Sequence, residues 1–324
     1  ELTNDTAALE IYERILKLQP RYLPAVNNLA WLLAENLGQL DRAYELARQA
    51  ADLQPGEPAV ADTLGWILFK RGEYGRALPL LQDSARKLPE EPEVQYHLGM
   101  THYMLGEEGP ARVALQTALQ LRPDFPHAQD AQRRLALLDL RPETLEPARF
   151  SELEKLVQRE PRDPILWSRL GEGYARQGQW KRALEAYEQA LKIAPGSVVF
   201  MTRLAQLSEE FPDRLDRAIE LARRARELAP DDGRVAHTLA RLVWRKGDQK
   251  WAASLLEEAA RRMPEELRVW YDLGWARYSL GQVSGALEAM RQAQSRKPDA
   301  VLAREIEDFQ RWVAWASEPP TAAE

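Results

Sequence analysis

The sequence predicts an all-α solenoid made of repeated pairs of short helices, and three recurring features predict it. Prolines recur at intervals of 34 or 35 residues, with one interval of 38, at Pro20, Pro55, Pro89, Pro123, Pro161, Pro195, Pro230, Pro264 and Pro298. An alanine lies twelve residues before most of these prolines. A small residue, itself preceded by a leucine, lies twelve or thirteen residues before that alanine. A fixed period of this length is typical of proteins that stack one helical unit on the next.

Residues 164–195 show how one unit is expected to fold. Apolar residues at helical spacing predict a first helix that ends before Gly178, where glycine allows a tight turn. A second helix follows, and Pro195 ends it. The small residues Gly171 and Ala183 fall where the two helices cross, so we expect a large side chain at Gly171 to destabilise the unit.

The units follow one another along almost the whole chain. Full units are expected at 23–57, 58–91, 92–125, 164–197, 198–232, 233–266 and 267–300. Residues 6–20 supply only a second helix, so the chain is expected to be part of a longer protein. Segment 126–163 departs from the pattern and predicts a helix near 126–139 and another near 148–160, with weak coupling between units near 140–148. A last helix is expected over 301–316, before a tail.

The unit at 164–197 also resembles a known family. Its order of Trp167, Leu170, Gly171, Tyr174, Ala183, Tyr187, Ala190 and Pro195 resembles the tetratricopeptide repeat (TPR). The resemblance covers nearly the whole chain. It implies a right-handed superhelical solenoid of helix–turn–helix repeats, in which the first helix of each unit lines a concave groove.

A longer period of 175 residues lies above the shorter one. Pro20, Pro55, Pro89 and Pro123 each recur 175 residues later, and the sequence LDRA at 40–43 recurs at 215–218. We interpret this period as the duplication of a block of five units, and the alternative is that shared family consensus produces the match. Duplication predicts two blocks, 1–140 and 141–324, with end helices at 126–140 and 301–316.

Composition and missing motifs argue against several classes of function. The chain has 44 Lys and Arg against 50 Asp and Glu, a formal charge of −6, which argues against a nucleic-acid binder. It has no cysteine, and its four histidines lack the spacing of a metal pair. Neither a nucleophile motif nor a phosphate-binding loop occurs. We therefore expect a protein that is not an enzyme, with no catalytic residue, metal or cofactor, and no transmembrane segment.

The candidate binding residues are those that the TPR resemblance places on the groove side of the first helices. In the first block they are Asn27, Trp31, Asp62, Trp66, Phe69, Tyr96, His97, Met100 and Tyr103. In the second block they are Arg203, His237, Arg241, Trp244, Arg245, Tyr271, Trp275 and Tyr278. Aromatic and arginine side chains often dominate the energy of binding interfaces. The alternative for Phe69, Tyr103, Trp244 and Tyr278 is a packing role.

These residues predict a non-catalytic scaffold that binds a peptide or helix of a partner protein in the groove. The alternative is a periplasmic exopolysaccharide-export component that contacts glycan or the export machinery, because segments 28–32 and 62–66 resemble bacterial envelope and exosortase-associated TPR proteins. A helical-repeat RNA reader is disfavoured by the acidic charge. Compartment stays open between bacterial cytoplasm and periplasm, because the sequence contains no targeting segment.

The two ends of the chain predict exposed apolar surface. Ile306, Phe309 and Val313 form one stripe of the last helix, and Trp312 and Trp315 widen it. At the other end, residues 6–20 are expected to expose a stripe of Leu9, Tyr12, Ile15 and Leu16. Weak self-association through these ends is one expectation, and a monomer in which both tryptophans fold back is the other.

Overall fold

The computed structural model describes residues 2–141 and 147–317, and the side chains of 2, 3, 147–149 and 315–317 lie outside the description. The described residues form helices joined by short turns, with no strand among them, as the sequence predicts. The chain divides into two compact units, Glu1–Phe200 (unit 1) and Met201–Glu324 (unit 2). The predicted blocks 1–140 and 141–324 concern duplicated sequence rather than compactness, and they stay a prediction.

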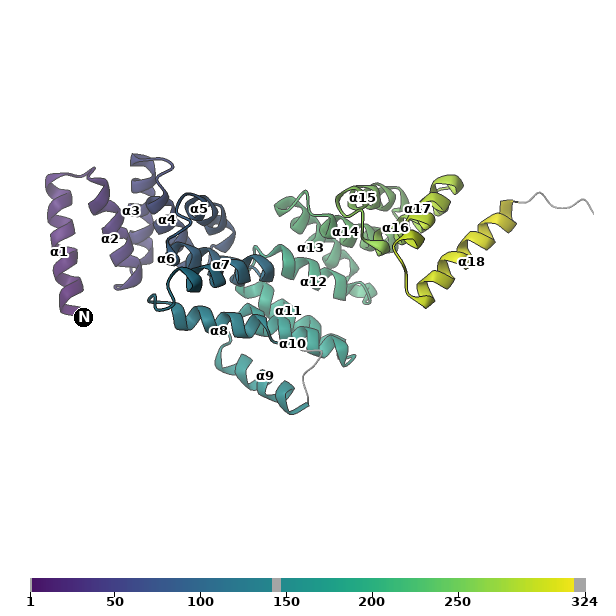
Figure 1. Cartoon of the computed structure of the whole chain (residues 1–324), viewed down its shortest axis with the longest axis horizontal. Coiled ribbons are helices and arrows are strands. Elements are labelled where there is room, and N and C mark those ends of the chain that lie inside the picture. The colour runs from purple at the N-terminus through teal and green to yellow at the C-terminus, as the bar shows by residue number, and fades with distance from the viewer. Residues whose placement is uncertain (1, 142–146, 318–324) are drawn as a thin grey trace, which may run out of the picture. The chain divides into compact units, whose positions relative to one another are not determined.

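The helices follow the predicted pairs (Figure 1). Unit 1 contains α1 (Leu2–Leu18), α2 (Leu23–Glu35), α3 (Leu40–Leu53), α4 (Pro58–Lys70), α5 (Tyr74–Lys87), α6 (Pro92–Met104), α7 (Glu108–Leu121), α8 (Ala128–Leu138), α9 (Pro147–Arg159), α10 (Pro164–Arg176) and α11 (Trp180–Ile193). The unit boundary falls within α12 (Val198–Ser208). Unit 2 continues with a 3-10 turn (Pro212–Arg214), α13 (Leu215–Leu228), α14 (Gly233–Arg245), α15 (Gln249–Arg262), α16 (Leu267–Ser279), α17 (Val283–Ser295) and α18 (Ala300–Ser317).

The repeated small residues form the crossing points between paired helices. Seven of the period alanines, Ala43, Ala77, Ala111, Ala183, Ala218, Ala252 and Ala286, are completely buried. A Cβ atom added at Gly171 would lie 2.7 Å from the ring of Tyr187 and 3.4 Å from the carbonyl oxygen of Ala183. The predicted close approach is confirmed, and Tyr187 is the nearest obstacle to a larger side chain.

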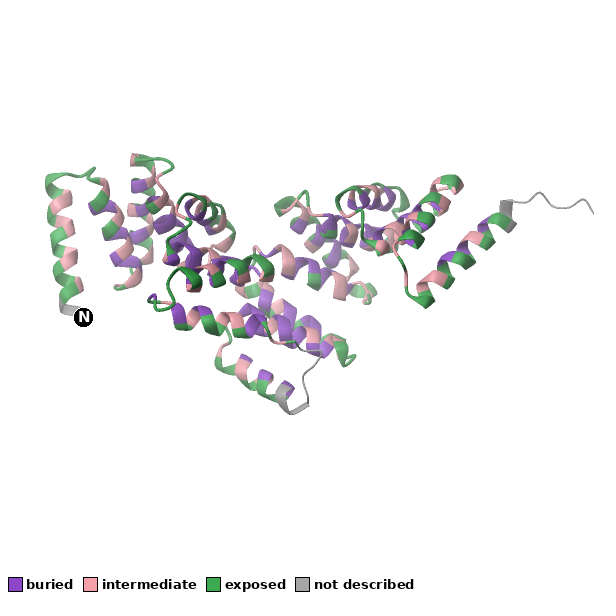
Figure 2. Ribbon diagram, viewed as in Figure 1, coloured by how far each residue is buried: buried purple, intermediate pink, exposed green. Residues whose placement is uncertain are grey.

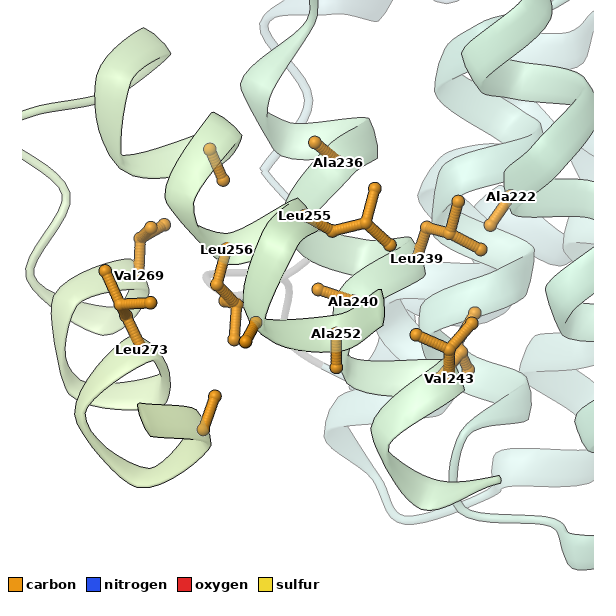
Figure 3. Close-up of a cluster of buried hydrophobic side chains, with 14 of the residues drawn as sticks. Ala222, Ala236, Leu239, Ala240, Val243, Ala252, Leu255, Leu256, Val269 and Leu273 are labelled. Atoms are coloured by element: carbon orange, nitrogen blue, oxygen red, sulfur yellow. The ribbon is translucent and has the colours of Figure 1, made fainter. Parts of the chain in front are cut away.

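The core of each unit is a layer of alanine, leucine and valine between neighbouring helices. Figure 3 shows this layer in unit 2, where Leu255 of α15 lies toward Leu239 of α14, and Leu256 lies on the side of Val269 and Leu273 of α16. In Figure 2 buried residues follow one side of each helix, and exposed residues follow the other. Burial of the apolar side of each amphipathic helix against its neighbours is therefore the main source of stability.

Segment 126–163 forms the two predicted helices, but they do not pack as an ordinary pair. α8 lies against α7, whereas α9 lies against α10 through its buried residues Phe150, Leu153 and Val157. α8 therefore covers the end of the helix-pair repeats before it, and α9 covers the start of the repeat after it. The stretch expected to be least protected, 140–148, lies largely outside the described residues.

The apolar stripe expected at α1 differs from the one observed. Leu9, Tyr12 and Leu16 pack against the core formed with α2 and α3, so the expectation that they are exposed is wrong. The exposed apolar residues of α1 are Ile11, 58% exposed, and Leu18, 78% exposed. α1 therefore buries the side that faces α2 and α3 and exposes Ile11 and Leu18.

The stripe expected at α18 is confirmed. Ile306, Phe309 and Val313 are buried against α16 and α17. Trp312 is 44% exposed, as expected for a residue that widens the stripe. The side chain of Trp315 lies outside the described residues.

Candidate binding faces of the two units

The first helices of unit 1 bring the predicted residues into contact. The indole of Trp66 stacks on the ring of His97 with centroids 4.0 Å apart, and on Phe69 with centroids 4.4 Å apart. The ring centroid of Trp31 lies 5.7 Å from that of His97, whose Nδ1 lies 2.9 Å from a carboxylate oxygen of Asp62. We call the face formed by α2, α4 and α6 the unit 1 face.

Most of the unit 1 face is buried by its own neighbours. Of the nine predicted residues, six are buried: Asp62, Trp66, Tyr96, His97, Met100 and Tyr103. Asn27, Trp31 and Phe69 are half-buried. Their role in binding stays a prediction, but a partner reaches only these last three without a rearrangement of the unit.

Carboxylates that the sequence analysis did not single out hold the polar edges of these rings. Glu35 accepts hydrogen bonds from the Trp66 indole and from Lys70, whose Nζ lies 3.0 Å from it. The hydroxyl of Tyr96 donates to Asp130 at 2.9 Å. Burial, together with the charge of Asp130, raises the pKa of Tyr96. The signal for these carboxylates is their spacing, because each lies 31 to 35 residues from its partner, about one repeat away.

Two buried atoms of the unit 1 face have no hydrogen-bond partner within the described part of the chain. They are Oδ1 of Asn27 and Nε2 of His97. Asn27 occupies the fifth position of the first helix in its repeat, as Asp62 does in the next repeat, whereas His97 occupies the sixth position of the repeat after that. A buried acceptor without a donor costs free energy, so these two atoms are expected to lower the stability of the unit 1 face.

The first helices of unit 2 leave the corresponding face accessible. Every predicted residue there is exposed or half-buried: Arg203 of α12, His237, Arg241, Trp244 and Arg245 of α14, and Tyr271, Trp275 and Tyr278 of α16. We call the face formed by α12, α14 and α16 the unit 2 face. Arg241 lies 3.0 Å from Glu209, and the Tyr271 hydroxyl donates to Glu305 at 3.0 Å. Burial, and to a smaller extent the hydrogen bond to Glu305, raises the pKa of Tyr271.

Three interactions recur between the units at the 175-residue offset. Asp62 and His97 of unit 1 correspond to His237 and Asp272 of unit 2, where the same two residue types are exchanged and lie 2.7 Å apart. The ion pair of Lys70 with Glu35 corresponds to that of Arg245 with Glu210. The bond from Tyr96 to Asp130 corresponds to the bond from Tyr271 to Glu305. These contacts extend the 175-residue period from the sequence to the structure, and duplication of a block stays a prediction.

A hollow of about 520 Å³ lies away from these faces, between α9, α10 and α11. Its apolar lining includes Trp167, Leu170 and Tyr174, and its rim is polar. Burial, and then the hydrogen bond to Glu154, raises the pKa of Tyr174 to about 12. The repeat pattern does not predict this hollow, because it assigns Leu170 and Tyr174 only to the packing between paired helices.

Metal-binding clusters and membrane-spanning helices are both absent from the described residues. No group of three or more His, Asp and Glu side chains is placed to hold a metal ion within residues 2–141 and 147–317. Over the same residues, no helix combines the length and the apolar composition needed to cross a membrane.

Comparison with known proteins decides the family. Residues 68–135, 164–197 and 237–301 match Tetratricopeptide repeat family models and together make up just over half of the chain. The chain belongs to the tetratricopeptide repeat family. TPR repeats act as protein-interaction scaffolds, and the family therefore supports a scaffold role for this chain.

Individual relatives are distant. TPR repeat-containing protein PA4667 of Pseudomonas aeruginosa is 34% identical over 73 residues, which are 22% of this chain and 12% of that protein. MamA from Desulfovibrio magneticus RS-1 has a TM-score of 0.41 at 16% identity, over 57% of this chain and 94% of MamA. YrrB, a TPR protein with an unusual peptide-binding site, has a TM-score of 0.39 at 15% identity, over 70% of this chain and 97% of YrrB.

Proposed function

We propose that this TPR chain is a scaffold that binds a peptide or helix of a partner protein across the unit 2 face. The supporting observation is accessibility: all eight predicted residues of that face are exposed or half-buried, whereas six of the nine on the unit 1 face are buried. Arg241 and Arg245 offer guanidinium groups to carboxylates or carbonyls, and Trp244 and Trp275 offer apolar surface.

Two arginines of this face, Arg241 and Arg245, are oriented by contacts within unit 2. Arg241 pairs with Glu209, and Arg245 donates to the carbonyl oxygen of Glu209 and lies 3.9 Å from Glu210. Both side chains keep about two fifths of their surface exposed. A guanidinium oriented in advance loses less conformational entropy when a partner binds, which favours recognition of a defined acceptor.

The test is selection of peptides from a displayed random library on the intact chain, followed by affinity measurement on variants. Arg241→Ala and Trp244→Ala are expected to weaken the selected peptides about tenfold or more. Arg224→Ala is the matched control, because Arg224 is an exposed arginine on a second helix, α13. Selected peptides that lose no affinity with Arg241→Ala and Trp244→Ala would contradict the proposal.

In the structure, the exposed ring of Trp275 is the feature that favours the glycan alternative, since aromatic rings can stack on sugars. The same variants discriminate the two ligands. Soluble acidic and neutral oligosaccharides that bind the intact chain and are lost with Trp275→Ala, while no displayed peptide binds, would replace the peptide proposal with the glycan one.

A further inference from the structure

Three aromatic residues at the end of unit 2 form an accessible surface, which we call the α16–α18 surface. Trp275 is 38% exposed and Trp312 44%, and Tyr278 lies between them with ring centroids 6.4 Å and 4.8 Å away, respectively. The buried ring of Phe309 supports Trp275 from below, with ring centroids 4.7 Å apart. Exposed tryptophans on a rigid helical base are typical of interfaces.

The residues 175 positions earlier in unit 1 are all buried. They are Met100, Tyr103 and Leu137, which correspond to Trp275, Tyr278 and Trp312. α10 accounts for part of the difference, because it contacts Tyr103 and the end of α8 in unit 1, whereas Met100 is buried among residues such as Trp66 and Leu115. The hydroxyl of Tyr103 donates to Asp163 at 2.8 Å, and Arg169 of α10 donates to the carbonyl oxygen of Leu138 at 3.0 Å.

The cover in unit 1 begins with the first turn of a helix. Asp163 is the N-cap of α10, where its carboxylate accepts from the backbone N–H groups of Ile165 and Leu166 and also from Tyr103 and Arg134. Ile165 and Leu166 have no exposed surface. A capped helix start therefore satisfies a tyrosine hydroxyl and buries apolar residues in the same contact.

The matching groups of unit 2 are open. Within the described residues the Tyr278 hydroxyl makes no hydrogen bond, unlike that of Tyr103. Phe200 lies 2.7 Å from where a Cβ atom of Gly106 would be, in the turn after α6, whereas Gly281 in the turn after α16 has nothing within 4 Å of that position. Among the described residues of unit 2, therefore, no helix contacts this surface as α10 contacts its equivalent in unit 1.

Two residues that differ between the two surfaces indicate which kind of helix would fit the α16–α18 surface. Phe309 stands where unit 1 has Arg134, which donates to Asp163 at 2.6 Å. Val283 stands where unit 1 has Glu108, which accepts from Arg169 at 2.6 Å. Both replacements remove a charge, so a helix that fits unit 2 keeps the N-cap acceptor for Tyr278 and is more apolar beyond it.

We propose that the α16–α18 surface docks the N-terminal turn of an amphipathic helix of a partner protein. The N-cap side chain of that helix, Asp, Asn, Ser or Thr, accepts a hydrogen bond from Tyr278, and the apolar residues of its first turn cover Trp275 and Trp312. This inference rests on the proposed scaffold function and specifies the form of the partner at one end of the unit 2 face.

The test uses a helix that this chain already contains. A fluorescein-labelled peptide of residues 161–176 that carries Arg169→Leu, because Val283 offers no partner to that charge, is titrated with the intact chain, and binding is followed by fluorescence anisotropy. We expect saturable binding, weakened at least about tenfold by the double change Trp275→Ala with Trp312→Ala. Trp180→Ala is the matched control, because Trp180 is 45% exposed on α11, outside this surface.

A double-mutant cycle tests the hydrogen bond itself. Tyr278→Phe in the chain and Asp163→Ala in the peptide are each expected to weaken binding about fivefold, and the two together no more than either alone. Losses that multiply would overturn the pairing of Tyr278 with the N-cap.

Two further outcomes would overturn docking at this surface. One is the absence of binding up to about 1 mM, which corresponds to a contact weaker than about 4 kcal/mol. The other is binding that Ile11→Glu abolishes and the tryptophan changes do not, which would place the peptide on α1. If either occurs while Arg241→Ala still weakens library peptides, the proposed function survives and this inference fails.

Discussion

In unit 1 the end of the first-helix layer lies beneath α10, and Tyr103 is completely buried, whereas in unit 2 the equivalent Tyr278 stands between two exposed tryptophans. The two surfaces occupy equivalent positions in the repeat pattern and differ in what covers them. The side chains beneath α10 differ as well, since Phe309 of unit 2 stands at the position of Arg134 in unit 1. The position of a residue within a TPR unit therefore does not decide whether it can bind a partner, because a later segment of the same chain can already occupy that position.

The largest expected effect is the loss of the cap that covers unit 1. Asp163→Ala removes the acceptor for Tyr103, Arg134 and the start of α10, and leaves Arg134 half-buried without this partner. We expect a loss of about 3–5 kcal/mol of unfolding free energy. Urea denaturation measures the loss, and hydrogen exchange should show it in α6, α8 and α10.

Asp232→Ala is the matched control in unit 2. Asp232 is the N-cap of α14, and its side chain contacts only the start of its own helix. Its replacement is expected to cost about 1 kcal/mol, as for an ordinary cap. Equal costs for the two variants would mean that Asp163 holds no cover in place.

The next effect compares the two turn glycines. Gly106 and Gly281 both have φ of 75°, so alanine at either position costs about 1–2 kcal/mol for the left-handed backbone. Gly106→Ala also pushes a methyl group against Phe200, which adds about 1–3 kcal/mol, whereas Gly281→Ala meets open space. Thermal unfolding of both variants measures the difference. Identical midpoints would contradict the covered turn of unit 1.

The exchanged Asp–His pairs give a smaller and more specific effect. Asp62→Ala leaves the completely buried His97 without its partner, and we expect a cost of about 1–3 kcal/mol. The double change Asp62→His with His97→Asp copies the order of unit 2 and is expected to recover most of that loss. Urea midpoints of the single and double variants check this, and a double variant no more stable than Asp62→Ala would contradict the equivalence of the two pairs.

The smallest effect is a pH dependence confined to unit 1. Burial, and then the charge of His97, lowers the pKa of His127, which stacks on Tyr96 with centroids 4.6 Å apart. The unfolded chain takes up this proton near pH 6.5 and the native state resists it, so the stabilisation is complete above about pH 6.5 and falls as pH is lowered. Leucine stands at the equivalent position 302 of unit 2.

His127→Leu therefore copies unit 2 and is expected to flatten the acid slope of stability. Urea midpoints of the intact chain and the variant at pH 7.5 and pH 5 provide the measurement. The same acid slope in both proteins would show that His127 is not its source.

The repeat pattern predicted the helices closely because each signal has a local cause. Second helices end two or three residues before the period prolines, as α11 does before Pro195, since proline cannot continue a helix. Gly171 and Ala183 marked a real crossing point because only small residues fit there. These features depend on neighbours in sequence or on the adjacent helix, and a single period contains both.

The burial of the unit 1 face could not be predicted in the same way. Tyr103 and Asp163 are 60 residues apart, and Ser197 donates to the carbonyl oxygen of Leu105 across 92 residues. No periodic signal specifies such contacts, because they depend on how α8 and α9 depart from the repeat. A sequence clue existed in the Asp163-Pro164 dipeptide, which is typical of a capped helix start, but it does not name the surface that the cap meets.

If the two blocks arose by duplication, as the sequence predicts, the exchanged pair of Asp62 with His97 and His237 with Asp272 constrains how they diverged. If one order was ancestral, single substitutions lead to the other through either two aspartates or two histidines. Two adjacent buried carboxylates repel each other, and one must take up a proton at a cost. Two neutral imidazoles avoid this, because each has one ring nitrogen that donates and one that accepts. The more favourable route between the two orders therefore passes through a histidine pair, and a chain with Asp62→His alone should be more stable than one with His97→Asp alone.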